Sequence, residues 1–180
     1  MSDCCKLPEL ADAMDDRCRR CGETGRRVLR ETMESLLKPE ALFRLANEPY
    51  YFDRTPECDV VYFSNEAESY FQKDELEVRV GLKETESPIP LCYCFGHTAE
   101  SAREEILTTG RSSVAERITA ETQAGNCSCE IKNPSGKCCL GDVNQAIGQI
   151  QKELEPAELM PEEPMPEEPM KVPVARSESG

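Results

Sequence analysis

The sequence predicts an α+β protein made of a small strand-rich module, a helical module and an extended tail. Short aromatic and β-branched runs favour strands in the first half, and helix start and stop signals dominate the second. Eleven cysteines stand beside 38% hydrophobic residues and no tryptophan, which indicates a small core that needs cross-links or metal ions. We expect a flexible leader (1–15), a strand-rich module (16–83), a helical module (91–153) and a disordered tail (156–180).

The strand-rich module is predicted from short runs of β-favouring residues. Tyr50–Phe52 and Val60–Phe63 are rich in aromatic and β-branched side chains, which pack well on a pleated surface. Leu76–Val80 alternates apolar and polar residues and is predicted as a half-buried strand that ends at Gly81. Helical turns are expected on both sides of Pro39.

The helical module is predicted from its capping residues. Thr98 is expected to cap a first helix that ends at Gly110, because glycine readily adopts the left-handed conformation that closes a helix. Ser113 and Glu116 have the spacing of a capping box at the start of a second helix. A third helix is expected from about 142 to 153.

The tail is a near repeat of Met-Pro-Glu-Glu-Pro over residues 159–170. Proline interrupts helices and sheet ladders, and neighbouring acidic side chains repel one another. We therefore expect disorder or polyproline II from about residue 156 onward. A solubilising role for this tail is favoured over a partner-binding role.

The charge balance excludes several classes of function. The chain carries 35 acidic and 21 basic residues, a formal net charge of −14, whereas binding to nucleic acid or anionic membranes needs clustered Lys and Arg. The first residues contain neither the basic nor the apolar part of a signal peptide. We expect a cytoplasmic protein whose cysteines bind metal rather than form disulfides, as is usual in a reducing compartment.

Six cysteines of the second half form the strongest metal-binding pattern. A Cys-x-Cys pair precedes the predicted helical pair, and a cysteine-rich loop follows it. Each iron of a 2Fe–2S cluster takes two protein thiolates, so four of the six suffice. Four thiolates also suit a zinc ion, and the spacing leaves both metals open. The candidates are Cys92, Cys94, Cys127, Cys129, Cys138 and Cys139.

A second metal site is predicted in the first half. Cys18, Cys21 and Gly22 have the Cys-x2-Cys-Gly pattern of a zinc knuckle, in which a tight turn presents two thiolates to one ion. Cys58 and Asp53, set between the two strand runs, are expected to complete a structural zinc site. The fourth ligand stays open, with Cys4, Cys5 and Asp59 as alternatives to Asp53.

The chain resembles a known family in residues 92–98, in Ala124-Gly125 and in residues 129–139 around Asn-Pro-Ser-Gly. These segments are similar to the N-terminal domain of CopZ-type copper chaperones, which contains a fold like the bacterioferritin-associated ferredoxin (BFD). The resemblance implies one zinc ion and one 2Fe–2S cluster. It implies the cluster ligands Cys92, Cys94, Cys129 and Cys139. Cys127 remains an alternative to Cys129, and Cys127 and Cys138 are otherwise accessory thiols.

The function expected from these features is electron transfer or copper homeostasis, with copper ions and a protein redox or metal-transfer partner. The chaperones of this family carry a second domain with a Met-x-Cys-x-x-Cys loop, and no such motif follows Glu153. The alternative is a non-redox adaptor or redox sensor that binds a protein partner. Phosphate loops, dinucleotide fingerprints and Ser-His-Asp arrangements are lacking from the sequence, so an enzyme is not expected.

Overall fold

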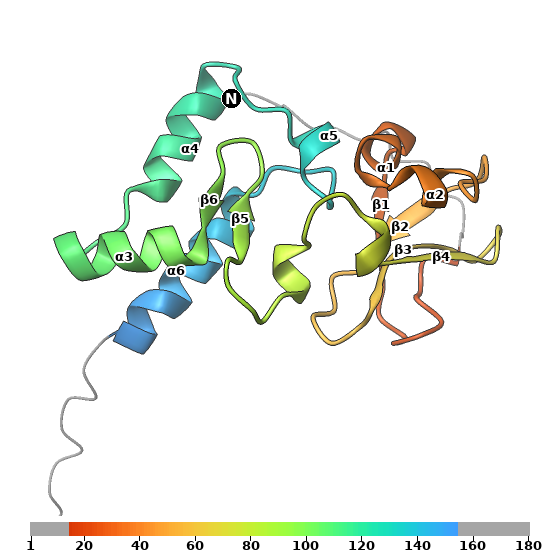
Figure 1. Ribbon diagram of the computed structural model, residues 1–180, viewed down its shortest axis with the longest axis horizontal. Helices are drawn as coiled ribbons and strands as arrows, with labels where there is room; N and C mark the ends of the chain where they lie inside the picture. Colours follow the sequence, from red (N-terminus) through yellow and green to blue (C-terminus); the bar gives the residue numbers. More distant parts are fainter. Residues whose placement is uncertain (1–14, 155–180) are drawn as a thin grey trace, which may run out of the picture.

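The computed structural model describes residues 15–154, which form two packed halves (Figure 1). We call residues 15–83 the sheet half and residues 90–154 the helical half. The predicted leader lies almost wholly, and the predicted tail wholly, outside the described residues. Within residues 15–154, none of the helices is long and apolar enough to span a bilayer.

The sheet half is built on one antiparallel sheet of four strands in the order β1-β2-β3-β4. Two predicted strands are confirmed, and two further strands extend the sheet at its edges. The strands are β1 (Arg26–Val28), β2 (Tyr50–Phe52), β3 (Val60–Ser64) and β4 (Ser69–Gln72). The predicted helical turns around Pro39 are also confirmed, as α1 (Arg30–Leu36) and α2 (Pro39–Leu42).

Aromatic side chains fill the core between the sheet and α1. Phe52, Tyr62 and Phe71 are almost completely buried and pack with Met33 and Val80. Burial of each such side chain stabilises the fold by roughly 1.5–3 kcal/mol. The sequence predicted strands at Phe52 and Tyr62 because aromatic and β-branched side chains suit a pleated, buried surface, whereas the strand of Phe71 was not predicted.

The predicted strand over Leu76–Val80 is wrong. Leu76 makes one isolated bridge with Leu37, and no ladder continues from it. Both apolar ends, Leu76 and Val80, are nonetheless buried in the core, whereas the central Val78 is only half-buried. The backbone instead turns through two short 3-10 helices on either side, η1 (Lys73–Glu75) and η2 (Gly81–Lys83).

The helical half combines a short hairpin with four helices. α6 packs against α3 and α4, and its buried face shares one core with them. The sequence did not predict α5, which is a single turn inside the cysteine-rich loop. The elements are β5 (Pro90–Cys92), β6 (His97–Thr98), α3 (Ala99–Thr109), α4 (Val114–Gln123), α5 (Cys129–Lys132) and α6 (Leu140–Leu154).

The capping predictions hold at one helix and fail at another. Thr98 caps α3 by accepting a hydrogen bond from the backbone N–H of Ser101, and Gly110 ends the helix at φ 81°. Ser113 precedes α4 but makes no capping hydrogen bond. Its hydroxyl donates instead to Glu105 on α3 at 2.6 Å, because the turn between the two helices brings that carboxylate close.

The two halves are joined by buried hydrogen bonds and an ion pair. The Tyr62 hydroxyl on β3 donates to the Pro134 carbonyl at 2.8 Å, and the Thr32 hydroxyl on α1 donates to the Glu130 carbonyl. Arg54 pairs with Asp142 in the first turn of α6 at 2.6 Å. Figure 1 shows α5 beside α1, so the cysteine-rich loop packs against the sheet half.

We expect Tyr62→Phe to lower the free energy of unfolding by about 1–3 kcal/mol, because the Pro134 carbonyl would stay buried without its donor. Urea unfolding followed by circular dichroism measures the change. Tyr50→Phe is the matched control, and a smaller loss is expected because its hydroxyl makes a longer, partly exposed bond to the Ala46 amide at 3.2 Å. Equal losses in the two variants would show that the Tyr62 bond does not join the halves energetically.

Candidate metal centres

The sheet half brings together the four residues that the sequence predicts as zinc ligands. Cys18 and Cys21 lie in the turn before β1, Asp53 directly follows β2, and Cys58 precedes β3. Their three sulfur atoms and one carboxylate oxygen all lie within 4.8 Å of one another. A donor set this compact suits one tetrahedral ion.

Local backbone geometry produces this convergence. The Gly22 amide donates to the Cys18 carbonyl at 2.7 Å, and Gly22 has φ 80°, so the knuckle turn needs glycine at this position. On the other side, the Asp53 amide extends the β2–β3 pairing by donating to Val61 at 2.9 Å. The Cys58 amide donates to the Thr55 carbonyl at 3.2 Å, and this turn directs the Cys58 thiol toward Cys18 and Cys21.

Hydrogen bonds to the Asp53 carboxylate dominate the electrostatics of this site. The Cys21 thiol donates to Asp53 Oδ2 at 3.1 Å, and the Thr55 amide donates to Oδ1 at 2.8 Å. Burial alone would raise the pKa of Asp53, but the bonds from the Cys18 and Cys21 thiols and from Thr55 lower it to about 2. Burial raises the pKa of Cys58 to about 12 and also raises the pKa of Cys18. A metal ion that binds here would therefore displace the protons of the thiols that donate to the Asp53 carboxylate.

Within residues 15–154, the alternative fourth ligand Asp59 is not in this set. Asp59 is exposed on the segment before β3, and Cys4 and Cys5 lie outside the described residues. Asp53 is thus the oxygen donor that the structure brings to the three thiols.

Sequence reasoning missed Lys83, the last residue of η2. Its Nζ atom donates to the Thr55 carbonyl at 2.6 Å and to the Cys58 carbonyl at 3.0 Å, and it lies 3.5 Å from Asp53 Oδ1. No sequence signal identifies it, because a lysine next to an acidic, polar connector is typical of a solvated surface.

The helical half brings together Cys92, Cys94, Cys129 and Cys139, the four thiols that the family resemblance assigns to the cluster. Cys92 ends β5, Cys94 lies in the hairpin turn, Cys129 begins α5, and Cys139 directly precedes α6. The sulfur atoms of Cys94 and Cys129 are 3.7 Å apart, and the Cys139 thiol lies close enough to those of Cys92 and Cys129 to shift their pKa values. Two stretches that are distant in sequence, residues 92–94 and residues 129–139, thus meet at one group of thiols.

Hydrogen bonding within this group favours thiolates at two positions. The bond from the Cys139 thiol lowers the pKa of Cys129 to about 6 and that of Cys92 to about 7. The same bonds raise the pKa of Cys139, and burial raises that of Cys94 to about 11. The Ser128 amide also donates to the Cys94 sulfur at 3.3 Å. Four sulfur donors in a largely buried setting with an amide N–H bonded to sulfur suit an iron–sulfur cluster.

The loop before Cys139 is closed by Asn133. Its side-chain amide donates to the Lys137 carbonyl at 2.7 Å, and its Oδ1 atom accepts from the Ser135 amide at 3.0 Å. Gly136 has φ 64°, and a Cβ atom there would lie 3.1 Å from the Thr32 hydroxyl oxygen on α1. The Asn-Pro-Ser-Gly sequence therefore suits both the turn and its close contact with the sheet half.

The two accessory thiols differ in exposure. Cys127 is half-buried in the segment before α5, and Cys138 is exposed beside Cys139. None of the nine cysteines within residues 15–154 is paired with another of them in a disulfide.

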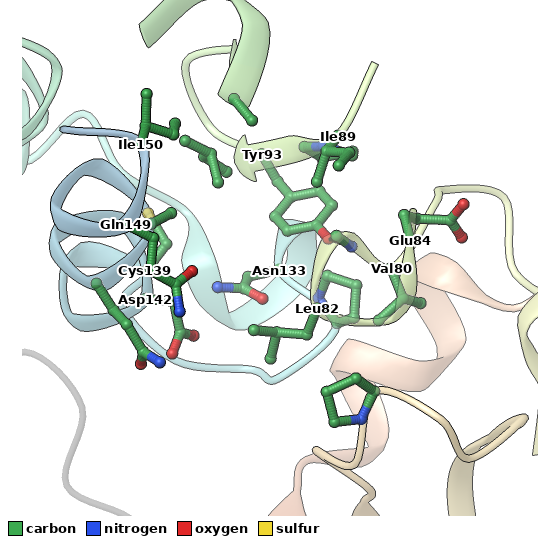
Figure 2. A pocket seen from close by; sticks show the side chains of 18 of the residues that line it. Val80, Leu82, Glu84, Ile89, Tyr93, Asn133, Cys139, Asp142, Gln149 and Ile150 are labelled. Carbon is green, nitrogen blue, oxygen red and sulfur yellow. Dashed lines mark hydrogen bonds between the residues drawn. The ribbon is translucent and has the colours of Figure 1, made fainter. Parts of the chain in front are cut away.

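An open cavity of ≈ 390 Å³ lies where the two halves meet. In Figure 2, Cys139 and Gln149 lie on one side of it and Leu82 and Glu84 on the other, with Tyr93 between them. The Tyr93 hydroxyl accepts a hydrogen bond from the Gly81 amide at 2.9 Å and donates to the Arg79 carbonyl at 3.0 Å. The residue between Cys92 and Cys94 therefore holds η2, which carries Lys83.

Comparison with known proteins places this arrangement in a family. The family described as "Zinc binding domain" (zf_CopZ) matches residues 15–77, which include all four residues of the candidate zinc site. The crystal structure of the N-terminal domain of CopZ from Archaeoglobus fulgidus is similar, with a TM-score of 0.60 and 35% sequence identity. The match covers 72% of this chain and 95% of that domain.

The chain belongs to the CopZ N-terminal domain family. It is also 38% identical over 124 residues to the protein named "Copper chaperone CopZ" of Archaeoglobus fulgidus. That match covers 68% of this chain and 57% of the chaperone, so the chain spans little more than half of its curated relative. The CopZ-type zinc-binding domain and the mixed helix and sheet architecture predicted from the sequence are confirmed.

Proposed function

We propose that this CopZ-type protein binds one structural zinc ion and one 2Fe–2S cluster, and that it acts in copper homeostasis by electron transfer. The zinc ligands would be Cys18, Cys21, Asp53 and Cys58. The cluster ligands would be the four thiols of the helical half, which would form a BFD-like module. The observation that carries this proposal is the convergence of those four thiols from two separate stretches of the sequence.

The zinc assignment is supported by the closed character of the site. Three of the four donor residues are buried, and the fourth, Cys21, is partly exposed. A structural zinc ion needs four protein ligands and no open position, and this set supplies four. Zinc there would link the turn before β1 to the loop between β2 and β3.

A 2Fe–2S cluster, when bound, carries one electron at a time. The chain's own residues would hold it at the junction of the hairpin, α5 and α6, with the Ser128 amide bonded to sulfur. The hydrogen bonds from the Tyr62 and Thr32 hydroxyls join the sheet half to the segment between Cys129 and Cys139. Thiolate ligands also require reduced cysteines, which favours the cytoplasm.

The role in copper homeostasis rests on the similarity to a protein named as a copper chaperone. Copper ions would be the substrate or cargo, and a protein would be the redox or metal-transfer partner. A reversible, accessible reduction potential supports electron transfer. A potential outside the biological range, with a tightly bound protein partner, would favour an adaptor instead.

Anaerobic purification with metal and sulfide analysis tests the proposal directly. We expect iron, sulfide and zinc in a ratio of about 2:2:1 per chain, with absorption bands between about 400 and 470 nm. A colourless protein that takes up no iron on anaerobic reconstitution would refute the cluster assignment. Zinc content is measured in the same sample, so the two metal sites are tested independently.

A further inference from the structure

Lys83 is a buried ammonium group beside the candidate zinc site. Its side chain is 0% exposed, and that of Asp53, its ion-pair partner, is 1% exposed. Lysine is almost never buried to this extent unless it is paired, because the desolvation of a charge is costly. Its three nearest oxygen partners all belong to the loop that carries Asp53 and Cys58.

The charge of the site explains why a cation is useful there. Three thiolates and one carboxylate carry four negative charges, and a zinc ion brings two positive charges. The occupied site would therefore keep two negative charges in a buried position. The Lys83 ammonium offsets one of them at close range, where the low dielectric makes charge interactions strong.

The geometry shows how Lys83 would act on the ligands. Asp53 Oδ1 faces Lys83 and the Thr55 amide, and Oδ2 faces the Cys21 sulfur. One carboxylate oxygen is thus engaged by the protein, and the other is directed toward the thiols. Lys83 also donates to the Thr55 and Cys58 carbonyls. These two bonds fix the loop that carries the ligands Asp53 and Cys58.

We propose that Lys83 is a positioning residue of the zinc site. It orients the Asp53 carboxylate toward the metal, fastens the ligand loop, and offsets part of the negative charge of the occupied site. This inference rests on the proposed zinc site, and it assigns a role to a residue outside the ligand set. Groups that orient metal ligands typically contribute 10–100-fold to metal affinity.

Competition of the full-length chain against a zinc chelator tests this role. Lys83→Met is expected to weaken zinc binding about 10–100-fold. Lys83→Gln is the second variant, because it removes the charge but keeps an N–H donor for a carbonyl, and it is used if Lys83→Met does not fold. Lys152→Met is the matched control: Lys152 is exposed on α6, and its loss changes the net charge equally. We expect it to bind zinc like the unchanged protein.

Two further readouts separate positioning from general stabilisation. The visible ligand-field spectrum of the cobalt-substituted protein should change in Lys83→Met and stay unchanged in Lys152→Met, because only the first alters the Asp53 ligand. In an Asp53→Asn background, Lys83→Met should cost much less affinity than it does alone, since the carboxylate charge that Lys83 orients is gone.

The outcomes distinguish this inference from the proposed function. If the unchanged protein binds zinc and the folded Lys83 variant binds it equally tightly, the role of Lys83 is refuted and the zinc site stands. The same holds if the losses at Lys83 and Asp53 are simply additive and the cobalt spectrum does not change. If the unchanged protein does not bind zinc at all, the proposed zinc site itself is refuted.

Discussion

Cys18→Ser is expected to abolish zinc binding and to lower the free energy of unfolding of the sheet half by several kcal/mol. Structural zinc contributes about 10 kcal/mol or more in small zinc-dependent domains, which rivals the whole net stability of an ordinary domain. Cys18 is completely buried and shares the site with Cys21, Asp53 and Cys58. Another ligand therefore cannot readily take the place of the sulfur that the substitution by serine removes. Zinc analysis and urea unfolding measure the two effects.

The iron content of the same variant is a built-in control. The cluster thiols come from residues 92–139, so iron should be retained when zinc is lost. Cys138→Ser is the matched substitution, because it removes an exposed cysteine and should keep both metals. Retention of a full equivalent of zinc in Cys18→Ser would refute the zinc assignment.

Cys129→Ser is expected to remove the cluster, with loss of iron and of visible absorption. Cys129 lies 3.7 Å from Cys94, sulfur to sulfur, and is buried, so it belongs to the thiol group that would hold the cluster. Serine lacks the soft sulfur donor that iron–sulfur clusters require. Anaerobic absorption spectra and iron analysis measure the loss.

Cys127→Ser is the matched control for this prediction, because the sequence alone left Cys127 and Cys129 as alternatives. It lies two residues earlier in the same loop and is half-buried. We expect it to keep iron and colour. If Cys127→Ser loses the cluster and Cys129→Ser keeps it, the ligand assignment is wrong at this position, although the cluster itself would stand.

The strongest local patterns were predicted correctly from the sequence. The aromatic runs became β2 and β3, and Thr98 and Gly110 marked the two ends of α3. These signals are reliable because the preference for a strand, a helix cap or a left-handed turn belongs to the residue itself. The prediction of a strand over Leu76–Val80 was wrong, because alternating apolar residues indicate burial but do not show that a neighbouring strand is there to pair with.

The sequence by itself determined which residue types are available for metal: the Cys-x2-Cys-Gly knuckle, the Cys-x-Cys pair and the later cysteine loop. Only the tertiary structure decided that Asp53 joins the knuckle, that Cys129 lies beside Cys94 and Cys139, and that Lys83 is buried beside Asp53. The physical reason is that short spacings constrain neighbouring ligands directly. Contacts between distant segments instead depend on how the sheet and the helices pack, which no local pattern encodes.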